Sequence, residues 1–453
     1  MKTVAFCTLG CKVNQYETNA MAQKFLEKGY QIIEEETPEN EEIKPDICII
    51  NTCTVTNMSD RKSRQMLRRM KEKNPNTIVV AVGCYAQVAK EELSKISEID
   101  LVLGNNEKVE IVRHVEEYIN NHIDNVELED VMYSKEFSDF GNVTYTEKTR
   151  AVIKIQDGCD RFCSYCIIPY ARGRVRSRKI DSIIKEIEQI AQKGIKEVVI
   201  TGIHIASYGK DFSMSKDPEL QNYKLIDLLE EINSINGIQR IRLGSIEPLL
   251  ITEEFVERLK KLEKICHHFH LSLQSGCDET LKRMNRKTNK DNIQNVISKI
   301  RKNIPNAIIR TTVMVGFPGE TKEDFNELYN FVKNAKFENL GAFTYSKEEG
   351  TPASRLKEQV HPMTKKARYN KIMQLQQQIS KENLAKLQGK EIKVLIENKT
   401  FDEKYYVGRS EMQVPDIDGM VYIKNEEELK IGNFVKCKVI DSREYDLIAE
   451  VID

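Results

Sequence analysis

Short apolar runs alternate with amphipathic stretches along the first 125 residues of the chain. Three of these runs are too short for helices and lead into polar loop residues: Thr3–Thr8, 46–50 and 77–82. Between them, residues 14–28 and 59–73 repeat their apolar positions at helical spacing. This alternation predicts an α/β domain with a mainly parallel sheet over residues 1–125, whose ligands bind outside the carboxyl ends of the strands.

Six more strand-like runs, separated by helical patterns such as 181–193 and 252–262, extend over residues 149–362. They occupy 151–155, 197–201, 239–243, 268–273, 307–315 and 340–345. Six βα units in succession predict a partial (β/α)6 barrel, an open relative of the eight-unit barrel. Active residues of such barrels lie at the C-terminal ends of the strands.

The segments that flank this barrel are polar. Residues 126–148 contain many acidic and small polar residues and predict an interdomain linker, and residues 363–387 have the pattern of a lysine-rich helical connector. In the final segment, 388–453, turns with Asp, Gly and Asn separate five short strand-like runs: 391–397, 405–409, 420–423, 434–441 and 447–451. This density of short strands predicts a small closed β-barrel of the oligonucleotide-binding type.

The composition describes a globular protein of 453 residues with 40% hydrophobic and 31% charged residues. Because the formal net charge is −1, RNA binding would depend on local basic patches, and DNA is not an expected partner. No apolar run approaches the roughly 18 residues of a membrane helix, and the N-terminus lacks a signal-peptide pattern. Eleven cysteines, several in tight spacings, favour metal ligation over disulfides. We therefore expect a cytoplasmic protein without a membrane partner.

The tightest cysteine spacing follows the first strand of the predicted barrel. Cys159, Cys163 and Cys166 form a C-x-x-x-C-x-x-C pattern on a loop that begins at Gly158, where the strand ends. Thiolates at this spacing can hold a [4Fe–4S] cluster, which normally takes four ligands. Three ligands leave one iron open for a small molecule, by the logic that separates catalytic from structural zinc sites. The alternatives are half of a zinc site, or a loop in which the cysteines occur by chance.

A second set of cysteines follows three strands of the predicted N-terminal sheet. Cys11, Cys53 and Cys84 each come a few residues after a different strand, so their thiols can converge at one edge of the sheet. These cysteines are therefore candidates for a second three-cysteine site. Cys7 and Cys48 lie within strand runs instead, and we expect both to be small buried core residues.

The C-x-x-x-C-x-x-C pattern resembles the signature of the radical S-adenosylmethionine (SAM) superfamily, in which the amino and carboxylate groups of SAM chelate the open iron. The resemblance implies that Tyr165, the aromatic residue before the last cysteine, lies near the SAM adenine. Polar or glycine-containing segments follow the other barrel strands, where glycine lets the backbone approach a ligand. We expect SAM contacts from these segments: Gly202, Ser245, Glu247, Gln274 and Gly316.

Two basic runs stand out against the nearly neutral total. Residues 59–73 place several arginines on one face of the predicted helix, either as a solvated face or as a nucleic-acid contact. The second run follows the central cysteines and has arginine at every other position: Arg172, Arg174, Arg176 and Arg178. The planar fork of arginine suits phosphate and carboxylate groups, so these four arginines are candidate substrate contacts.

The whole chain resembles the radical-SAM methylthiotransferase family, in which an N-terminal methylthiotransferase domain precedes a radical SAM domain and a C-terminal TRAM domain. Both cysteine sets carry the resemblance. The segment Leu9-Gly-Cys-Lys-Val-Asn-Gln-Tyr-Glu17 looks like the branch that modifies N6-threonylcarbamoyladenosine (t6A) at position 37 of tRNA. The isopentenyladenosine branch usually has Gln-Met-Asn in this segment, and the ribosomal-protein branch Lys-Asn.

By this resemblance, the central cysteines hold the [4Fe–4S] cluster that cleaves SAM, and Cys11, Cys53 and Cys84 hold an auxiliary [4Fe–4S] cluster linked to sulfur insertion. The resemblance implies methylthiolation of C2 of the adenine, with SAM as both radical source and methyl donor. An arginine of the second basic run is expected to pair with the threonyl carboxylate of t6A. The implied partners are tRNA and an electron donor such as flavodoxin or ferredoxin.

An aromatic C–H has no acidic proton for a side-chain base, so the cofactor must carry the chemistry. We accordingly assign no catalytic proton-transfer residue. Other functions stay open: methylthiolation of N6-isopentenyladenosine-37 or of a ribosomal protein, or a non-enzymatic iron–sulfur RNA-binding protein. Iron content and SAM cleavage separate the enzymes from the binding protein, and the mass of the modified product separates the enzymes from one another.

Overall fold

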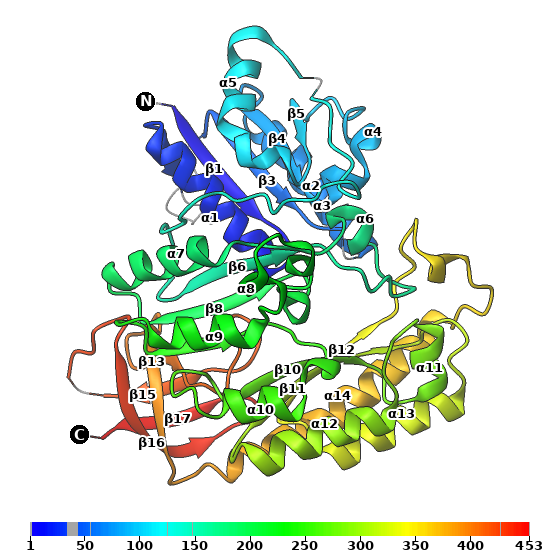
Figure 1. The fold of residues 1–453 in the computed structure, drawn as a ribbon, viewed down its shortest axis with the longest axis vertical. Coiled ribbons are helices and arrows are strands. Elements are labelled where there is room, and N and C mark those ends of the chain that lie inside the picture. The colour runs from blue at the N-terminus through cyan, green and yellow to red at the C-terminus, as the bar shows by residue number, and fades with distance from the viewer. Residues whose placement is uncertain are drawn as a thin grey trace.

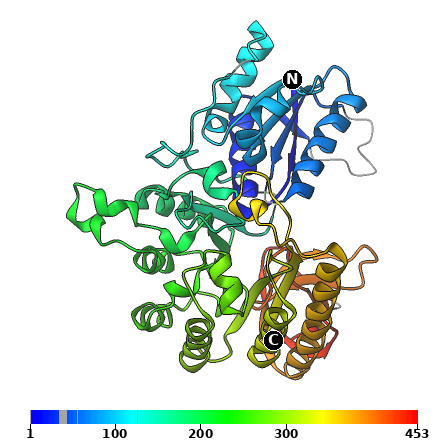
Figure 2. The same ribbon diagram turned by 90° about the vertical axis from the view of Figure 1, so that its right-hand side faces the viewer.

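The computed structural model describes residues 2–33, 44–54, 56–124, 126–146, 148–425 and 427–452. It places an N-terminal sheet domain at the top, a barrel-like domain in the middle and a small β-barrel at the lower left (Figure 1). The segment near residue 350 (yellow) lies at the right of Figure 1, between the N-terminal domain above it and the middle domain below it. In the turned view it lies toward the viewer, again with the N-terminal domain above it (Figure 2).

The N-terminal domain is a five-stranded sheet in the order β2-β1-β3-β4-β5, with every pair of neighbours parallel. Its strands are β1 (Thr3–Thr8), β2 (Gln31–Ile33), β3 (Ile47–Thr52), β4 (Ile78–Gly83) and β5 (Leu101–Leu103). Its helices are α1 (Lys12–Glu27), α2 (Asn57–Lys73), α3 (Cys84–Val88), α4 (Lys90–Leu93) and α5 (Ile111–Asn121). The predicted α/β domain is confirmed; the apolar pattern misses β2 and β5, which have three residues each.

Apolar side chains cover both faces of this sheet, and β3 is buried along its whole length, as expected of a central parallel strand. One core contains Met21 and Phe25 of α1, and the other contains Cys7, Cys48 and side chains of α2. Cys7 and Cys48 are 3% and 1% exposed, which confirms that both are core residues.

The middle domain contains the six predicted parallel strands. They are β6 (Ala151–Asp157), β8 (Glu197–Gly202), β9 (Arg240–Leu243), β10 (His268–Gln274), β11 (Ile308–Val315) and β12 (Asn339–Thr344). Hydrogen bonds join them into the sheets β7-β6-β8-β9 and β10-β11-β12, and isolated parallel bridges such as Ile246 to Leu271 connect the two sheets. A short strand, β7 (Arg176–Ser177), runs antiparallel at the β6 edge and was not predicted from the pattern.

Helices follow the strands, and most of them pack on the strands in one continuous apolar core. They are α6 (Ile168–Arg172), α7 (Ile180–Gln192), α8 (Pro218–Gln221), α9 (Leu225–Ser234), α10 (Glu253–Leu259), α11 (Asp278–Arg283), α12 (Lys290–Asn303) and α13 (Lys322–Ala335). The short helices α6 and α8 contribute no side chain to this core. The long helix α14 (Pro362–Ala385) buries Ile372 and Ile379 in the same core before the chain enters the last domain. No helix among the described residues is both long and apolar enough to cross a membrane.

The C-terminal domain is a closed barrel in the order β13-β14-β15-β17-β16, as predicted. Its strands are β13 (Glu391–Lys399), β14 (Tyr406–Arg409), β15 (Val421–Lys424), β16 (Phe434–Ser442) and β17 (Leu447–Val451). Arginines of β9 attach it to the middle domain: Arg240 donates to the carbonyl oxygens of Arg409 and Lys393, and Arg242 to those of Ser410 and Glu411. These bonds satisfy buried guanidinium groups with backbone acceptors, so the small barrel is docked and not tethered loosely.

Candidate active site

The central cysteine loop begins where β6 ends. Gly158 has φ +72°, and a Cβ atom there would lie 1.8 Å from the carbonyl oxygen of Arg174. Only glycine fits this turn, because both the left-handed backbone and the close approach exclude a side chain. The next residue, Cys159, donates its backbone N–H to the carbonyl of Gly173 at 3.0 Å. The loop is therefore pinned against the exit of α6.

The segment after α11 holds the middle of the same loop. Ser164 donates its backbone N–H to Met284 O at 3.0 Å and its hydroxyl to Arg283 O at 2.8 Å. The Asn285 side chain donates to Phe162 O at 3.0 Å. Phe162 itself has φ +47°, an uncommon value for a bulky residue, so this loop conformation is imposed by its surroundings.

The three thiols of this loop share one environment. Burial raises the pKa of Cys159 to about 11, and burial together with the nearby charges of Cys163 and Cys159 raises the pKa of Cys166 to about 12. Metal binding here must therefore release protons. Among the described residues, no three His, Cys, Asp or Glu side chains are grouped closely enough to hold a single metal ion. A [4Fe–4S] cluster needs a wider arrangement, because each cysteine binds its own iron. The loop thiols lie near enough for their charges to affect one another's pKa, as a shared cluster requires.

Glu247 collects the basic side chains beside this loop. It is 4% exposed and pairs with Arg161, with His204 Nε2 at 3.1 Å and with Arg286 at 3.8 Å. Burial alone would raise the pKa of Glu247, but the His204 hydrogen bond and the two arginines lower it below its ordinary value. Arg286 in turn lies 3.8 Å from Cys163 Sγ. These three basic partners were not predicted from the sequence, although His204 is only two residues beyond Gly202.

The other predicted SAM contacts all lie at carboxyl ends of the barrel strands. Ser245 hydrogen-bonds His270 Nδ1 at 2.8 Å. Gln274 has φ +70°, and its Oε1 atom is buried without a hydrogen-bond partner in the described part of the chain. Gly202 lies so close to β6 that a Cβ atom would be 2.9 Å from Gln156 O.

Gly316 and Tyr165 lie beside the carboxyl end of β11. Gly316 has φ +72° and donates its N–H to Glu320 Oε1 at 2.9 Å, and a Cβ atom there would lie 2.4 Å from Lys365 Cγ of α14. The Tyr165 ring meets the edge of Phe317 with centroids 6.5 Å apart. All the predicted contacts thus surround the mouth of the barrel, while ligand binding by each of them stays a prediction.

The N-terminal cysteines follow three neighbouring strands of the first sheet: Cys11 after β1, Cys53 after β3 and Cys84 after β4. A Cβ atom on Gly10 would lie 2.8 Å from Cys53 Sγ, so this thiol reaches the β1 turn. The Cys11 side chain is exposed, yet surrounding protein and the charge of Cys84 raise its pKa.

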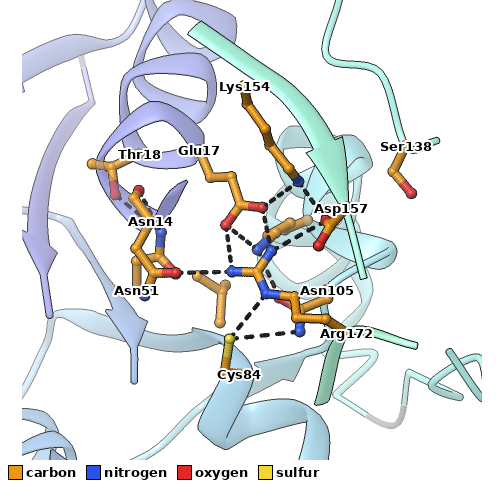
Figure 3. Close-up of polar contacts among 12 residues, drawn as sticks. Asn14, Glu17, Thr18, Asn51, Cys84, Asn105, Ser138, Lys154, Asp157 and Arg172 are labelled. Carbon is orange, nitrogen blue, oxygen red and sulfur yellow. Dashed lines mark hydrogen bonds and ion pairs between the residues drawn. The ribbon is translucent and has the colours of Figure 1, made fainter. Parts of the chain in front are cut away.

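A buried charge cluster joins this second site to the barrel domain (Figure 3). Glu17 of α1 lies at its centre and pairs with Arg172 of α6, Lys154 of β6 and Lys108. Asp157 accepts from Lys154 and from Arg172, the latter at 3.3 Å. Although burial would raise the pKa of Glu17, the three cations hold it well below its ordinary value. None of these residues was identified from the sequence except Arg172.

Three of the four candidate substrate arginines are inside the protein. Arg172, Arg176 and Arg178 are at most 1% exposed. Arg176 donates to backbone carbonyls, and Arg178 pairs with Glu186 at 2.9 Å. Their guanidinium groups are therefore occupied by protein partners, so these three candidates are not available to a substrate carboxylate in this structure. Arg174 differs, because its side chain is 54% exposed and only 3.5 Å from the exposed Asp160.

Family models match three parts of the chain. They are described as "Uncharacterized protein family UPF0004" over residues 3–104, "Radical SAM superfamily" over 153–332 and "TRAM domain" over 389–452. Among solved structures, the radical S-adenosylmethionine methyltransferase TsrM from Kitasatospora setae, with cobalamin and a [4Fe–4S] cluster bound, has a TM-score of 0.55 and 17% identity. The match covers 78% of this chain and 77% of TsrM, and it supports the fold alone.

Curated relatives match nearly the whole chain. The threonylcarbamoyladenosine tRNA methylthiotransferase MtaB of Bacillus subtilis is 38% identical over 97% of this chain and 94% of its own. The ribosomal protein uS12 methylthiotransferase RimO of Thermoanaerobacter sp. is 40% identical over 99% of this chain and 100% of its own. Both relatives are methylthiotransferases, which use SAM and [4Fe–4S] clusters, as predicted. The chain belongs to the radical-SAM methylthiotransferase family.

Proposed function

We propose that this protein methylthiolates C2 of t6A at position 37 of tRNA in the cytoplasm. The observation that carries the choice of substrate is the Lys12-Val13-Asn14 segment beside Cys11, which looks like the t6A branch. Two MtaB relatives support it, the second from Aquifex aeolicus with 41% identity over 89% of this chain. The second candidate is ribosomal protein uS12, because the RimO relatives are just as similar.

The two cysteine sets divide the work in this proposal. Cys159, Cys163 and Cys166 would hold the cluster that binds SAM, and Cys11, Cys53 and Cys84 would hold the auxiliary cluster. When bound, the clusters and SAM supply a radical and sulfur. Substitution at an aromatic C–H requires both. The protein's own contribution is to fix the loop that carries the first set and to keep Glu247 ionised among basic side chains at the barrel mouth.

The C-terminal barrel offers a surface for RNA. Phe401, at the tip between β13 and β14, is fully exposed, with Lys399 and Lys404 on either side of it. Exposed aromatic rings stack on unpaired bases, and nearby lysines attract the phosphate backbone. This combination supports tRNA as the substrate and a role for the barrel in anchoring it away from the reacting base.

Nucleoside mass spectrometry of tRNA from cells lacking this protein tests the proposal. We expect t6A to persist and its methylthio derivative to disappear, with restoration by the wild-type gene and not by a Cys163→Ala variant. In parallel, the mass of ribosomal protein uS12 is measured in the same cells. Loss of a methylthio group from uS12, with tRNA unchanged, would assign the protein to the second candidate.

A further inference from the structure

The side chain of Arg172 reaches from the barrel domain to a cysteine of the N-terminal domain. Its Nε–H donates to Cys84 Sγ at 3.1 Å, as Figure 3 shows. Its terminal nitrogens are held by Asn14 Oδ1 at 2.8 Å and by both oxygens of Glu17. A guanidinium group with so many fixed partners has one orientation, so its direction toward the sulfur is set by the fold.

The same arginine is close in sequence to the other cysteine set. Arg172 is the sixth residue after Cys166 and the last of the five residues of α6. The exit of α6 is fixed as well, since Gly173 has φ +74° and a Cβ atom there would lie 2.0 Å from Val131 O. A short rigid element therefore connects the SAM-binding loop to the sulfur of Cys84.

The charges around Arg172 leave a place for an anion. Three buried cations, Arg172, Lys108 and Lys154, face two buried carboxylates, Glu17 and Asp157. An unbalanced buried charge is costly unless a counter-charge lies nearby. A thiolate at Cys84, which cluster binding requires, supplies that counter-charge at the atom that Arg172 already contacts.

We propose that Arg172 is a positioning residue for the auxiliary cluster, which donates a charge-assisted hydrogen bond to the Cys84 thiolate and raises the reduction potential of that cluster. The inference rests on the proposed auxiliary site at Cys11, Cys53 and Cys84. Hydrogen bonds to cluster sulfurs and nearby positive charge both stabilise the more negative, reduced form. Removal of Arg172 therefore shifts the potential of this cluster to more negative values.

The test is a potentiometric titration of the reconstituted full-length protein, followed by electron paramagnetic resonance. The signal that is lost in the triple alanine variant of Cys159, Cys163 and Cys166 belongs to the SAM-binding cluster, and the signal that this variant keeps belongs to the auxiliary cluster. In Arg172→Gln we expect the second signal to titrate at more negative potential and the first to stay at its wild-type potential. Arg172→Lys keeps the charge but not the Nε–H, so its potential should lie between those of wild type and Arg172→Gln.

Arg178→Gln is the matched control. Arg178 is as buried as Arg172 and also joins the barrel domain to α1, through Tyr16 and Glu186, but no cysteine is among its partners. A wild-type auxiliary potential in Arg172→Gln, or an equal shift in Arg178→Gln, would overturn the proposal. If the Arg172→Gln protein does not assemble the auxiliary cluster, the same comparison is made with Arg172→Lys, and a wild-type auxiliary potential in that variant would overturn the proposal. A triple alanine variant of Cys159, Cys163 and Cys166 that retains no cluster would refute the auxiliary site itself, which is a separate result.

Discussion

The two cysteine sites are built on the same local plan in two different settings. Each has one buried carboxylate that gathers three basic side chains, and in each one of these is an arginine that contacts a cysteine sulfur. At the barrel mouth the pair is Glu247 and Arg286, with the sulfur 3.8 Å from the guanidinium. At the N-terminal site the pair is Glu17 and Arg172, with the sulfur at 3.1 Å.

The settings differ in access to water. The partners of Glu247 are partly exposed, with 25% of the Arg161 side chain and 15% of the His204 side chain accessible. The partners of Glu17 are at most 2% exposed and come from two domains. The first site must admit SAM, so the charged side chains around Glu247 remain accessible and can rearrange. At the second site Cys11 is exposed, but the charge cluster around Glu17 is sealed between domains, so its charges depend on one another and on the docking of the domains.

The largest expected effect separates the two cysteine sets by activity. Cys163→Ala should abolish both reductive SAM cleavage and methylthio product, because the open iron is lost. Cys53→Ala should still form 5′-deoxyadenosine but no methylthio product, because its site lies in the other domain. Chromatography with mass spectrometry measures both compounds in one reaction.

Iron content is the control for this pair. The wild-type protein should take up about eight irons and either triple-cysteine alanine variant about four, as expected for two four-iron clusters. If the N-terminal cysteines merely pack, Cys53→Ala would keep product formation and lose stability by about 1 kcal/mol, as for a small core truncation. Wild-type product formation in Cys53→Ala would therefore contradict the two-site mechanism.

The elements of this fold could be predicted because their signal is local. The six barrel strands and both cysteine sets are read from contiguous runs and from cysteines that directly follow them. The charge cluster has no such signal, since Glu17 and Arg172 are 155 residues apart and meet only after two domains dock. Lys154 was the available clue, because a lysine inside an otherwise apolar strand requires a buried partner.

The burial of the arginine run is a second feature that the local sequence does not predict. Its position beside the cysteines was read correctly, but its exposure depends on what covers it. The segment before β6 lies over the run, so that Arg176 meets Val131 O, and Arg178 meets Asp139 at 3.1 Å and Gly141 O. A segment that reads as a polar linker gives no indication that it covers a particular strand.

Removal of the central carboxylate of the sealed site should have the next largest effect. Glu17→Gln leaves three buried cations against Asp157 alone, and breaking a buried ion pair typically costs about 3–5 kcal/mol. We expect amides of α1 and β6 to lose protection against hydrogen exchange by an amount in this range. Glu117→Gln breaks an exposed helix pair with Arg113 and should change stability by less than about 1 kcal/mol. Equal effects of the two substitutions would show that the cluster is hydrated and not sealed.

Neighbouring arginines sharpen the contrast between sealed and open positions. Arg174 is the exposed member of the run, and Arg174→Met should lower kcat/KM for tRNA bearing t6A if it pairs with the threonyl carboxylate. A charge-assisted pair is worth about 1.5–3 kcal/mol, which corresponds to a loss of roughly 10- to 150-fold. SAM cleavage without tRNA should be unchanged. Arg113→Met, at an arginine of similar exposure (55%), is the control, and the same kcat/KM in both variants would exclude the pairing.

The smallest expected effect is a difference in acid sensitivity between the two regions. Burial, with Arg310 and Lys12 nearby, lowers the pKa of His270 in the barrel to about 3, and burial lowers the pKa of His268 as well. These groups are neutral when folded and take up protons on unfolding below about pH 6.5. Their contribution to stability is therefore complete above that pH and falls as the pH falls toward 3.

The N-terminal cluster should behave differently over the same range. The pKa of Glu17 is lowered by its cations, so its contribution is complete above the ordinary carboxylate pKa of about 4.3 and is lost only in stronger acid. As the pH falls from 7 to 5, we expect the amides of β10 and β11 to lose protection against hydrogen exchange, and those of α1 to keep it. His270→Gln can keep the contacts to Ser245 and Thr312. It should remove up to one proton from the uptake on unfolding, which lowers the slope of barrel stability against pH by up to about 1.4 kcal/mol per pH unit. An unchanged slope in His270→Gln would mean that other groups govern the acid response of the barrel.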